Sequence, residues 1–149
     1  MDKIKELREA TGAGVMDAKH ALEEANGDIK KATEIITAKG LAKAEKRSDR
    51  EVNSGKVYCY THGGGSAGAM VEVACETDFV ANTDEFSALC KEIALQIVSM
   101  NPKDVEELLK MDYIRDASKT IEQLVTELVG KTGENIRVTR FARFKLGVE

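Results

Sequence analysis

The chain has 149 residues, of which 42% are hydrophobic and 32% are charged. This balance is typical of a globular protein that can bury a core without a metal or a disulfide. With 22 basic and 26 acidic residues the net charge is −4. Because general binding to a nucleic-acid backbone needs a basic surface, we expect no direct nucleic-acid partner.

The first residues are amphipathic and charged, unlike a signal peptide, and no apolar run is long enough to span a membrane. We therefore expect a cytoplasmic protein that binds no membrane. Its cysteines, Cys59, Cys75 and Cys90, lie 16 and 15 residues apart and form no Cys-x-x-Cys pair. This spacing predicts free, buried thiols in a reducing compartment, and no metal or cofactor site.

Three helices are predicted within the first 40 residues. Residues 2–10 and 15–25 each show apolar spacings of three or four, and each stretch ends at a turn that contains glycine. Asp28 is predicted to cap a third helix, which closes at Gly40. The sequence thus predicts a three-helix module of the ubiquitin-associated (UBA) type at residues 1–40, a kind of module that binds other proteins.

A charged stretch follows at residues 41–54, with four basic and three acidic residues and little apolar content. This composition predicts a linker, either a tether or a helical extension of the module. We interpret Lys46, Arg47 and Arg50 as a solvated face and not as nucleic-acid contacts. The second domain, an α+β core, is then expected at residues 55–149.

Two alternating strands are predicted at residues 56–61 and 69–74, joined by a glycine-rich loop into a hairpin. The loop is not a phosphate cradle, because no Lys-Ser or Lys-Thr follows it and the next element is a strand. An enzyme that uses Cys75 with His62 is one hypothesis, although no Ser or Cys lies in a recognisable nucleophile motif. We expect a protein that acts by binding and not as an enzyme.

An aromatic residue, Phe79, stands in the polar turn at residues 77–81. In one interpretation its ring folds back onto the next helix as a hydrophobic staple. In the other it is a rigid aromatic presented to another protein, since aromatics are enriched among the residues that carry interface energy. Residues 66–90 contain five acidic residues and no basic one, so this face should prefer a basic or apolar partner.

The strongest amphipathic pattern follows a capping signal formed by Asn82 and Glu85, and it stops before Pro102. Pro102 is predicted to open a short helix, and another helix is predicted at residues 118–129, ending at Gly130.

The closing segment, residues 133–144, is predicted to be a third strand. Its alternation slips, which predicts a bulge near Thr139 or Arg140. The fold class is therefore α+β, with a helical N-terminal module and a core of three antiparallel strands packed against helices.

Three stretches resemble the elongation factor Ts family of bacterial and organellar type. They are Thr-Gly-Ala-Gly-Val-Met-Asp at residues 11–17, Thr-Asp-Phe-Val at residues 77–80 and Lys-Thr-Gly-Glu-Asn-Ile at residues 131–136. The resemblance extends from residue 3 to about residue 146. It implies a guanine nucleotide exchange factor that binds elongation factor Tu, with GDP or without nucleotide, during translation elongation.

The same resemblance implies which residues contact elongation factor Tu. Phe79 is expected to wedge between helices of the GTPase, and the N-terminal module is expected to hold its nucleotide-binding domain. Gln96 stands where the family often has a partner-contacting His, and Val15 stands where it usually has a Met. The implied contact residues are Arg8, Val15, Met16, Thr77, Asp78, Phe79, Val80 and Gln96.

By the resemblance, we expect the chain to be a short form, without the second core subdomain and the inserted helical hairpin of longer family members. Its single sheet has an incomplete edge, which predicts a homodimer joined through the core. The alternative function is a UBA-type adaptor without exchange activity, in which residues 1–40 bind another protein and Thr-Asp-Phe-Val is ordinary core.

Overall fold

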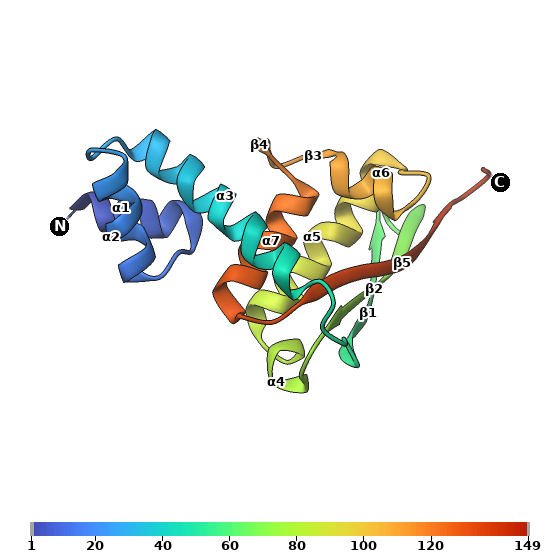
Figure 1. Cartoon of the computed structure of the whole chain (residues 1–149). Coiled ribbons are helices and arrows are strands. Elements are labelled where there is room, and N and C mark those ends of the chain that lie inside the picture. The colour runs from blue at the N-terminus through green and yellow to red at the C-terminus, as the bar shows by residue number, and fades with distance from the viewer. Residues whose placement is uncertain (1, 149) are drawn as a thin grey trace.

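The computed structural model describes residues 2–148 (Figure 1). Its helices are α1 (Asp2–Thr11), α2 (Val15–Glu24), α3 (Ile29–Arg47), α4 (Asp78–Ala81), α5 (Asp84–Met100), α6 (Val105–Lys110) and α7 (Ile121–Thr132). Its strands are β1 (Ser54–His62), β2 (Ala67–Cys75), β3 (Asp112–Tyr113), β4 (Asp116–Thr120) and β5 (Ile136–Lys145). The helices α1 and α2 lie at one end of the molecule, and α3 leads from them to the core.

The N-terminal helices enclose a small core of their own. Leu7 is fully buried at its centre, and the alanines Ala18, Ala21 and Ala32 allow the helix backbones to approach it closely. The predicted cap of α3 is confirmed, because the Asp28 side chain accepts a hydrogen bond of 3.1 Å from the amide of Lys31.

The sequence predicted that the third helix closes at Gly40. In the structure the helix continues to Arg47. A glycine inside a helix costs about 1 kcal/mol, so packing must stabilise this part of α3. Ala44 packs against the core, and Arg47 donates a hydrogen bond of 3.3 Å to the carbonyl of Val129 on α7. Residues 41–47 are thus the helical extension that the sequence left open as an alternative.

The three-stranded antiparallel sheet predicted for the core is confirmed, with strand order β1-β2-β5. The predicted bulge is also confirmed. Glu72 pairs with Arg140 but the next residue, Val73, pairs with Val138, so Thr139 is the extra residue. The Thr139 hydroxyl and the Arg140 guanidinium both donate to the Glu72 carboxylate and lower its pKa.

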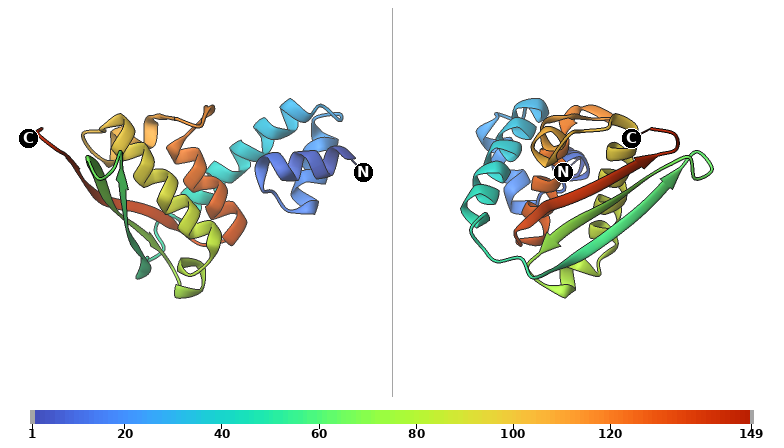
Figure 2. Two further views of the ribbon diagram at one scale, coloured as in Figure 1. Left: turned by 180° about the vertical axis from the view of Figure 1, so that it is seen from behind. Right: turned by 90° about the vertical axis from the view of Figure 1, so that its right-hand side faces the viewer.

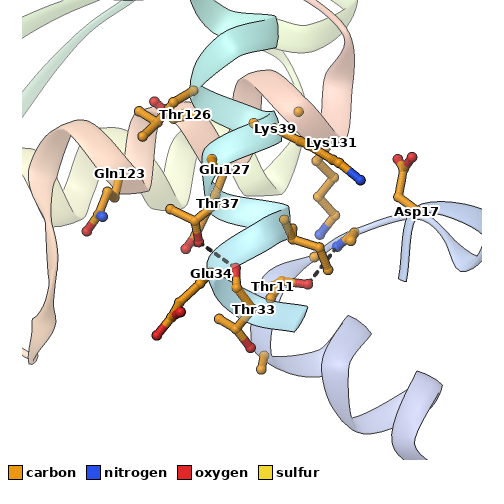
Figure 3. A pocket seen from close by; sticks show the side chains of 18 of the residues that line it. Thr11, Asp17, Thr33, Glu34, Thr37, Lys39, Gln123, Thr126, Glu127 and Lys131 are labelled. Atoms are coloured by element: carbon orange, nitrogen blue, oxygen red, sulfur yellow. Dashed lines mark hydrogen bonds between the residues drawn. The ribbon is translucent and has the colours of Figure 1, made fainter. Parts of the chain in front are cut away.

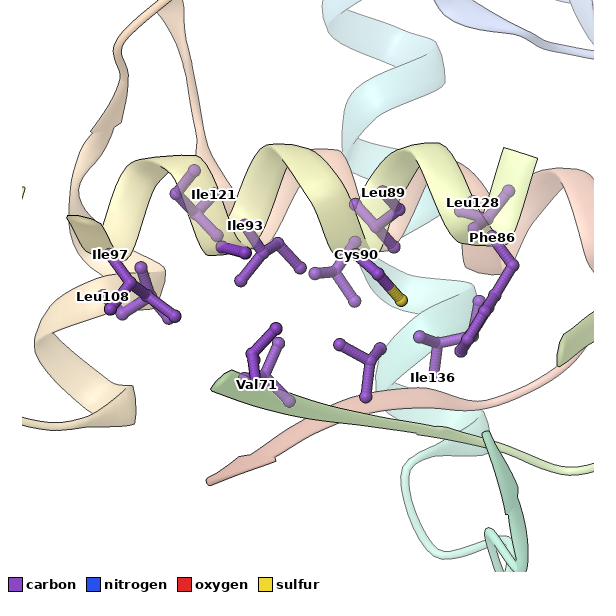
Figure 4. Close-up of a cluster of buried hydrophobic side chains, with 14 of the residues drawn as sticks. Val71, Phe86, Leu89, Cys90, Ile93, Ile97, Leu108, Ile121, Leu128 and Ile136 are labelled. Atoms are coloured by element: carbon purple, nitrogen blue, oxygen red, sulfur yellow. The ribbon is translucent and has the colours of Figure 1, made fainter. Parts of the chain in front are cut away.

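The core lies between this sheet and α5. Phe86, Ile93 and Ile97 on α5 and Val71 on β2 are fully buried, and Figure 4 shows the α5 side chains directed at the strand. In Figure 2 the helices of the described chain lie on one face of the sheet, and its other face is uncovered.

Several predicted boundaries are wrong by a few residues. The cap of α5 is Thr83, whose hydroxyl accepts from the amide of Phe86 at 3.2 Å, whereas Asn82 ends α4. Pro102 does not open α6, which is capped by Asp104. The last helix starts at Ile121 behind a capping box and passes through Gly130 to Thr132.

The hairpin of β3 and β4 has no counterpart in the sequence prediction. Tyr113 on β3 donates to the Glu92 carboxylate on α5 at 2.6 Å, and burial together with this bond raises the Tyr113 pKa to about 12. No helix within residues 2–148 is long and apolar enough to cross a membrane.

Candidate functional site

The turn that carries Phe79 is a single helical turn, α4, between the end of β2 and the start of α5. The Thr77 side chain caps it and accepts a bond of 3.4 Å from the amide of Val80. Ala81 is buried and Val80 is partly buried against the core, whereas the Phe79 side chain is 86% exposed. The staple interpretation is therefore wrong, because a stapled ring would be buried.

A glutamate that is distant in the sequence, Glu134, holds this turn. The Glu134 carboxylate accepts one hydrogen bond from the amide of Thr77 at 2.9 Å and another from the Thr77 hydroxyl at 2.6 Å. Sequence reasoning did not select Glu134 as a site residue, although it lies in the third family-like stretch. Contact with residue 77 is long-range, so no local pattern indicates it.

The neighbouring residues extend this junction to the segment that follows α3. The backbone amide of Asn135 donates to the Glu76 carboxylate at 2.7 Å, and Arg50 pairs with the same carboxylate at 3.4 Å. The buried Asn135 side chain donates to the carbonyls of Ser48 and Arg50, at 3.3 and 2.8 Å. The Arg50 side chain therefore forms an ion pair within the protein, whereas the sequence analysis interpreted it only as part of a solvated face.

The module residues implied by the family resemblance come together at the turn between α1 and α2. Arg8 donates from Nε to the carbonyl of Ala13 at 3.3 Å. Val15 and Met16, the first two residues of α2, are 50% and 59% exposed. These side chains are thus available on the surface, at a place remote from α4 along the molecule (Figure 1).

Gln96 does not join either surface, which corrects its assignment as a partner contact. Its side chain is fully buried, donates to the carbonyl of Asp112 at 2.9 Å and accepts from the amide of Ile114 at 3.0 Å. The amide group holds the β3–β4 hairpin and is buried, so it does not reach a partner in this conformation.

A cleft of about 600 Å³ separates the module from the core (Figure 3). The α1–α2 turn, α3 and α7 line it. Two of its carboxylates are engaged in ion pairs, Asp17 with Lys43 at 3.5 Å and Glu127 with Lys119 at 2.9 Å. Val15 and Met16 lie outside its lining, so the cleft and the module surface are separate features.

The structure does not bring together the residues of the enzyme hypothesis. Cys75 pairs with Ser54 and His62 pairs with Ala67, at opposite ends of the β1–β2 ladder, which puts them roughly 26 Å apart at the rise of a strand. Within residues 2–148 no group of three or more His, Cys, Asp or Glu side chains could hold a metal ion.

The thiols are free, but the prediction that all of them are buried is wrong for Cys59, which is exposed. Burial raises the pKa of Cys90 to about 12. Burial, with the nearby Glu134 carboxylate, also raises the pKa of Cys75, whose thiol donates to the carbonyl of Thr77 at 3.1 Å.

Taken from the residues upward, this is an α+β protein with a helical N-terminal module, and exposed apolar side chains lie at Phe79 on α4 and at Val15 and Met16 on α2. The family model described as Elongation factor TS matches residues 76–149. Elongation factor Ts of Caldanaerobacter subterraneus subsp. tengcongensis is 43% identical over 189 aligned positions, with 97% of this chain and 94% of the relative covered.

Further relatives agree. Elongation factor Ts of Leptospira biflexa is 44% identical, with 98% of this chain and 96% of the relative covered, and that of Thermotoga neapolitana is 41% identical, with 100% and 98% covered. The chain therefore belongs to the elongation factor Ts family, a family of translation elongation factors. Because the first alignment has 189 positions and this chain has 149 residues, at least 40 positions of that alignment are gaps in this chain.

Proposed function

We propose that this protein is a guanine nucleotide exchange factor that binds elongation factor Tu and promotes GDP release during translation elongation in the cytoplasm. The observation that carries the proposal is the 86% exposure of Phe79 on a braced turn, within the family-like stretch Thr-Asp-Phe-Val. An exposed ring contributes little to the stability of the free protein, whereas burying it against a partner contributes about 1.5 to 3 kcal/mol to the free energy of binding.

Exchange of this kind rests on differential binding and needs no covalent chemistry. The factor must bind nucleotide-free elongation factor Tu more tightly than the GDP-bound form, and by linkage it then lowers the affinity for GDP by the same factor. Insertion of Phe79 is the contact that distinguishes the two forms. Thr77, Asp78 and Val80 shape the turn around it.

The N-terminal module supplies the second contact. In this proposal the module holds the nucleotide-binding domain of the partner through Arg8, Val15 and Met16. Phe79 inserts between helices of the GTPase at a separate contact. Two contacts on one chain raise the effective concentration of each for its site, so the module increases occupancy without taking part in nucleotide release.

We also propose that two copies of the chain associate through the uncovered face of the sheet. The exposed apolar residues of the sheet and its end are Val57, Met70, Phe144, Leu146 and Val148. Exposed apolar side chains gathered on one side of a sheet are typical of an interface, and a two-fold dimer would cover them with the same face of a second copy.

The adaptor alternative requires Thr-Asp-Phe-Val to be ordinary core, which the exposure of Phe79 does not support. The test is release of a fluorescent GDP analogue from purified elongation factor Tu with and without this protein. Exchange activity predicts a rate that rises with the concentration of the factor. An unchanged rate under saturating binding would leave an adaptor and exclude an exchange factor.

A further inference from the structure

We infer that Glu134 is the residue that positions Phe79, an inference that rests on the proposed exchange function. Its carboxylate accepts both the amide N–H and the hydroxyl of Thr77, the cap of α4. Glu134 reaches this cap from the chain that follows α7, 57 residues further along the sequence. It does not need to touch the partner to act, because it acts through Thr77.

The turn needs such a brace because it is too short to stabilise itself. An isolated helical turn is unfavourable, since fixing its backbone costs more than its first hydrogen bond returns. Here the helix has only four residues, and the ring at its second position is 86% exposed. The position of the ring is therefore set by the anchors of α4: the buried Ala81, the partly buried Val80 and the cap at Thr77.

Each polar group of Thr77 has a partner, which makes its orientation unique. Its amide and its hydroxyl proton go to Glu134, and its hydroxyl oxygen accepts from the amide of Val80 at 3.4 Å. Its carbonyl accepts from the amide of Ala81 at 3.2 Å and from the Cys75 thiol at 3.1 Å. Because Glu134 takes the hydroxyl proton, the lone pairs of that oxygen are directed at α4.

Glu134 itself is fixed by the end of α7. Gly133 ends that helix in the left-handed conformation, with φ 77°, and its amide donates to the carbonyl of Val129 at 2.9 Å. The amide of Glu134 donates to the Thr132 hydroxyl at 3.3 Å. Hydrogen bonds therefore connect the end of α7 to Glu134, and Glu134 to Thr77.

The two segments also brace each other reciprocally. The side chain of Glu134 accepts the amide of Thr77, and the side chain of Glu76 accepts the amide of Asn135 at 2.7 Å. A carboxylate that accepts hydrogen bonds from a fixed backbone is a strong, directional partner. A glutamine at position 134 keeps the shape but offers an NH₂ group in place of one acceptor oxygen.

The test is a double-mutant cycle on GDP release from elongation factor Tu, with the variants Glu134→Ala, Phe79→Ala and both together. Loss of charge-assisted bonds to the cap should slow stimulated release about tenfold in the Glu134→Ala variant. In the Phe79→Ala background the same change should have no further effect, because there is no ring left to position. Glu134→Gln should fall between the wild type and Glu134→Ala.

Glu92→Gln is the matched control. Glu92 is also a half-buried carboxylate that accepts two short hydrogen bonds from residues distant in the sequence, from Tyr113 at 2.6 Å and from Arg115 at 2.7 Å. These bonds hold the β3–β4 hairpin, which lies far from α4 (Figure 1). Its exchange activity should equal that of the wild type. Equal slowing by Glu134→Ala with and without Phe79, or no slowing in the wild-type background, would overturn the inference.

A second measurement on the free protein separates this inference from the proposed function. Amide hydrogen exchange at residues 77–81 should become about tenfold faster in Glu134→Ala, because Thr77 loses its acceptor and α4 its cap. Unchanged protection would overturn the positioning role whatever the exchange assay gives. If Phe79→Ala alone left GDP release normal while protection was lost in Glu134→Ala, the wedge would fail and the brace would stand.

Discussion

The side-chain amide of Gln96 donates a hydrogen bond of 2.9 Å to the carbonyl of Asp112, across 16 residues of sequence. Its oxygen accepts from the amide of Ile114 at 3.0 Å, so one buried side chain serves both backbone groups of the hairpin end. Gln96 thus stabilises the fold of the free protein, whereas the family resemblance implied that it contacts elongation factor Tu.

Replacing Gln96 with Ala should destabilise the protein by about 2 to 4 kcal/mol, since two backbone groups lose their partner and a cavity remains. Urea unfolding measures this change. Ser99→Ala, an exposed position on the same helix, should leave the unfolding free energy within about 0.5 kcal/mol of the wild type. A Gln96→Ala protein as stable as the wild type would contradict the role given to this side chain.

Local patterns predicted the parts of the fold that depend on periodicity. The alternation of β2 placed Val71 and Val73 inside and Glu72 outside, and the slip in the last strand located the bulge at Thr139. Helix ends that are set by tertiary packing were not predictable in this way. Helix α3 continues past Gly40 because its far half packs on α7, a contact with no signal in the local sequence.

The hairpin of β3 and β4 escaped prediction for a related reason. Its second strand reads Asp-Ala-Ser-Lys-Thr and has no apolar alternation. Side chains of α5, Glu92 and Gln96, hold it in place, and only the folded structure shows that contact. The candidate site divides similarly. Sequence motifs selected Phe79, whereas its brace Glu134 required the structure.

Met16→Asp should weaken binding to elongation factor Tu by about 1 to 3 kcal/mol, because it places a charge in an apolar contact. Folding should barely change, since Met16 is 59% exposed. Isothermal titration calorimetry measures the affinity. Met100→Asp is the control, a methionine 49% exposed on α5, and it should bind as the wild type does. Unchanged affinity for Met16→Asp would mean that the module does not contact the partner.

The thiols should differ in reactivity in the native protein. Cys59 is exposed, whereas Cys75 and Cys90 are buried with a raised pKa, so near pH 8 they have little thiolate to react. Titration with a coloured disulfide reagent should therefore modify Cys59 quickly and the other two only after denaturant is added. Rapid modification of all three thiols without denaturant would contradict the burial of Cys75 and Cys90.

Met70→Glu should convert the proposed homodimer to a monomer, because it places a charge in the middle of the sheet face that the second copy would cover. Met70 is 51% exposed on the central strand, so the isolated chain should keep its fold. Light scattering at tens of micromolar measures the mass of both proteins, with Met100→Glu as the control. A monomeric wild-type protein at that concentration would rule out the dimer.

The account depends most on Phe79, and one pair of measurements on Phe79→Ala tests it directly: thermal unfolding, and stimulation of fluorescent GDP release from elongation factor Tu. Because the ring is 86% exposed, its removal should change stability by less than about 0.5 kcal/mol. Stimulated release should fall at least about tenfold, since the ring is buried only in the complex.

Ile114→Ala, which trims another exposed apolar side chain, in the turn between β3 and β4, serves as the control and should leave both quantities unchanged. The account predicts a Phe79→Ala protein with a normal melting temperature and slow exchange. A large drop in melting temperature with normal exchange per folded molecule would contradict it.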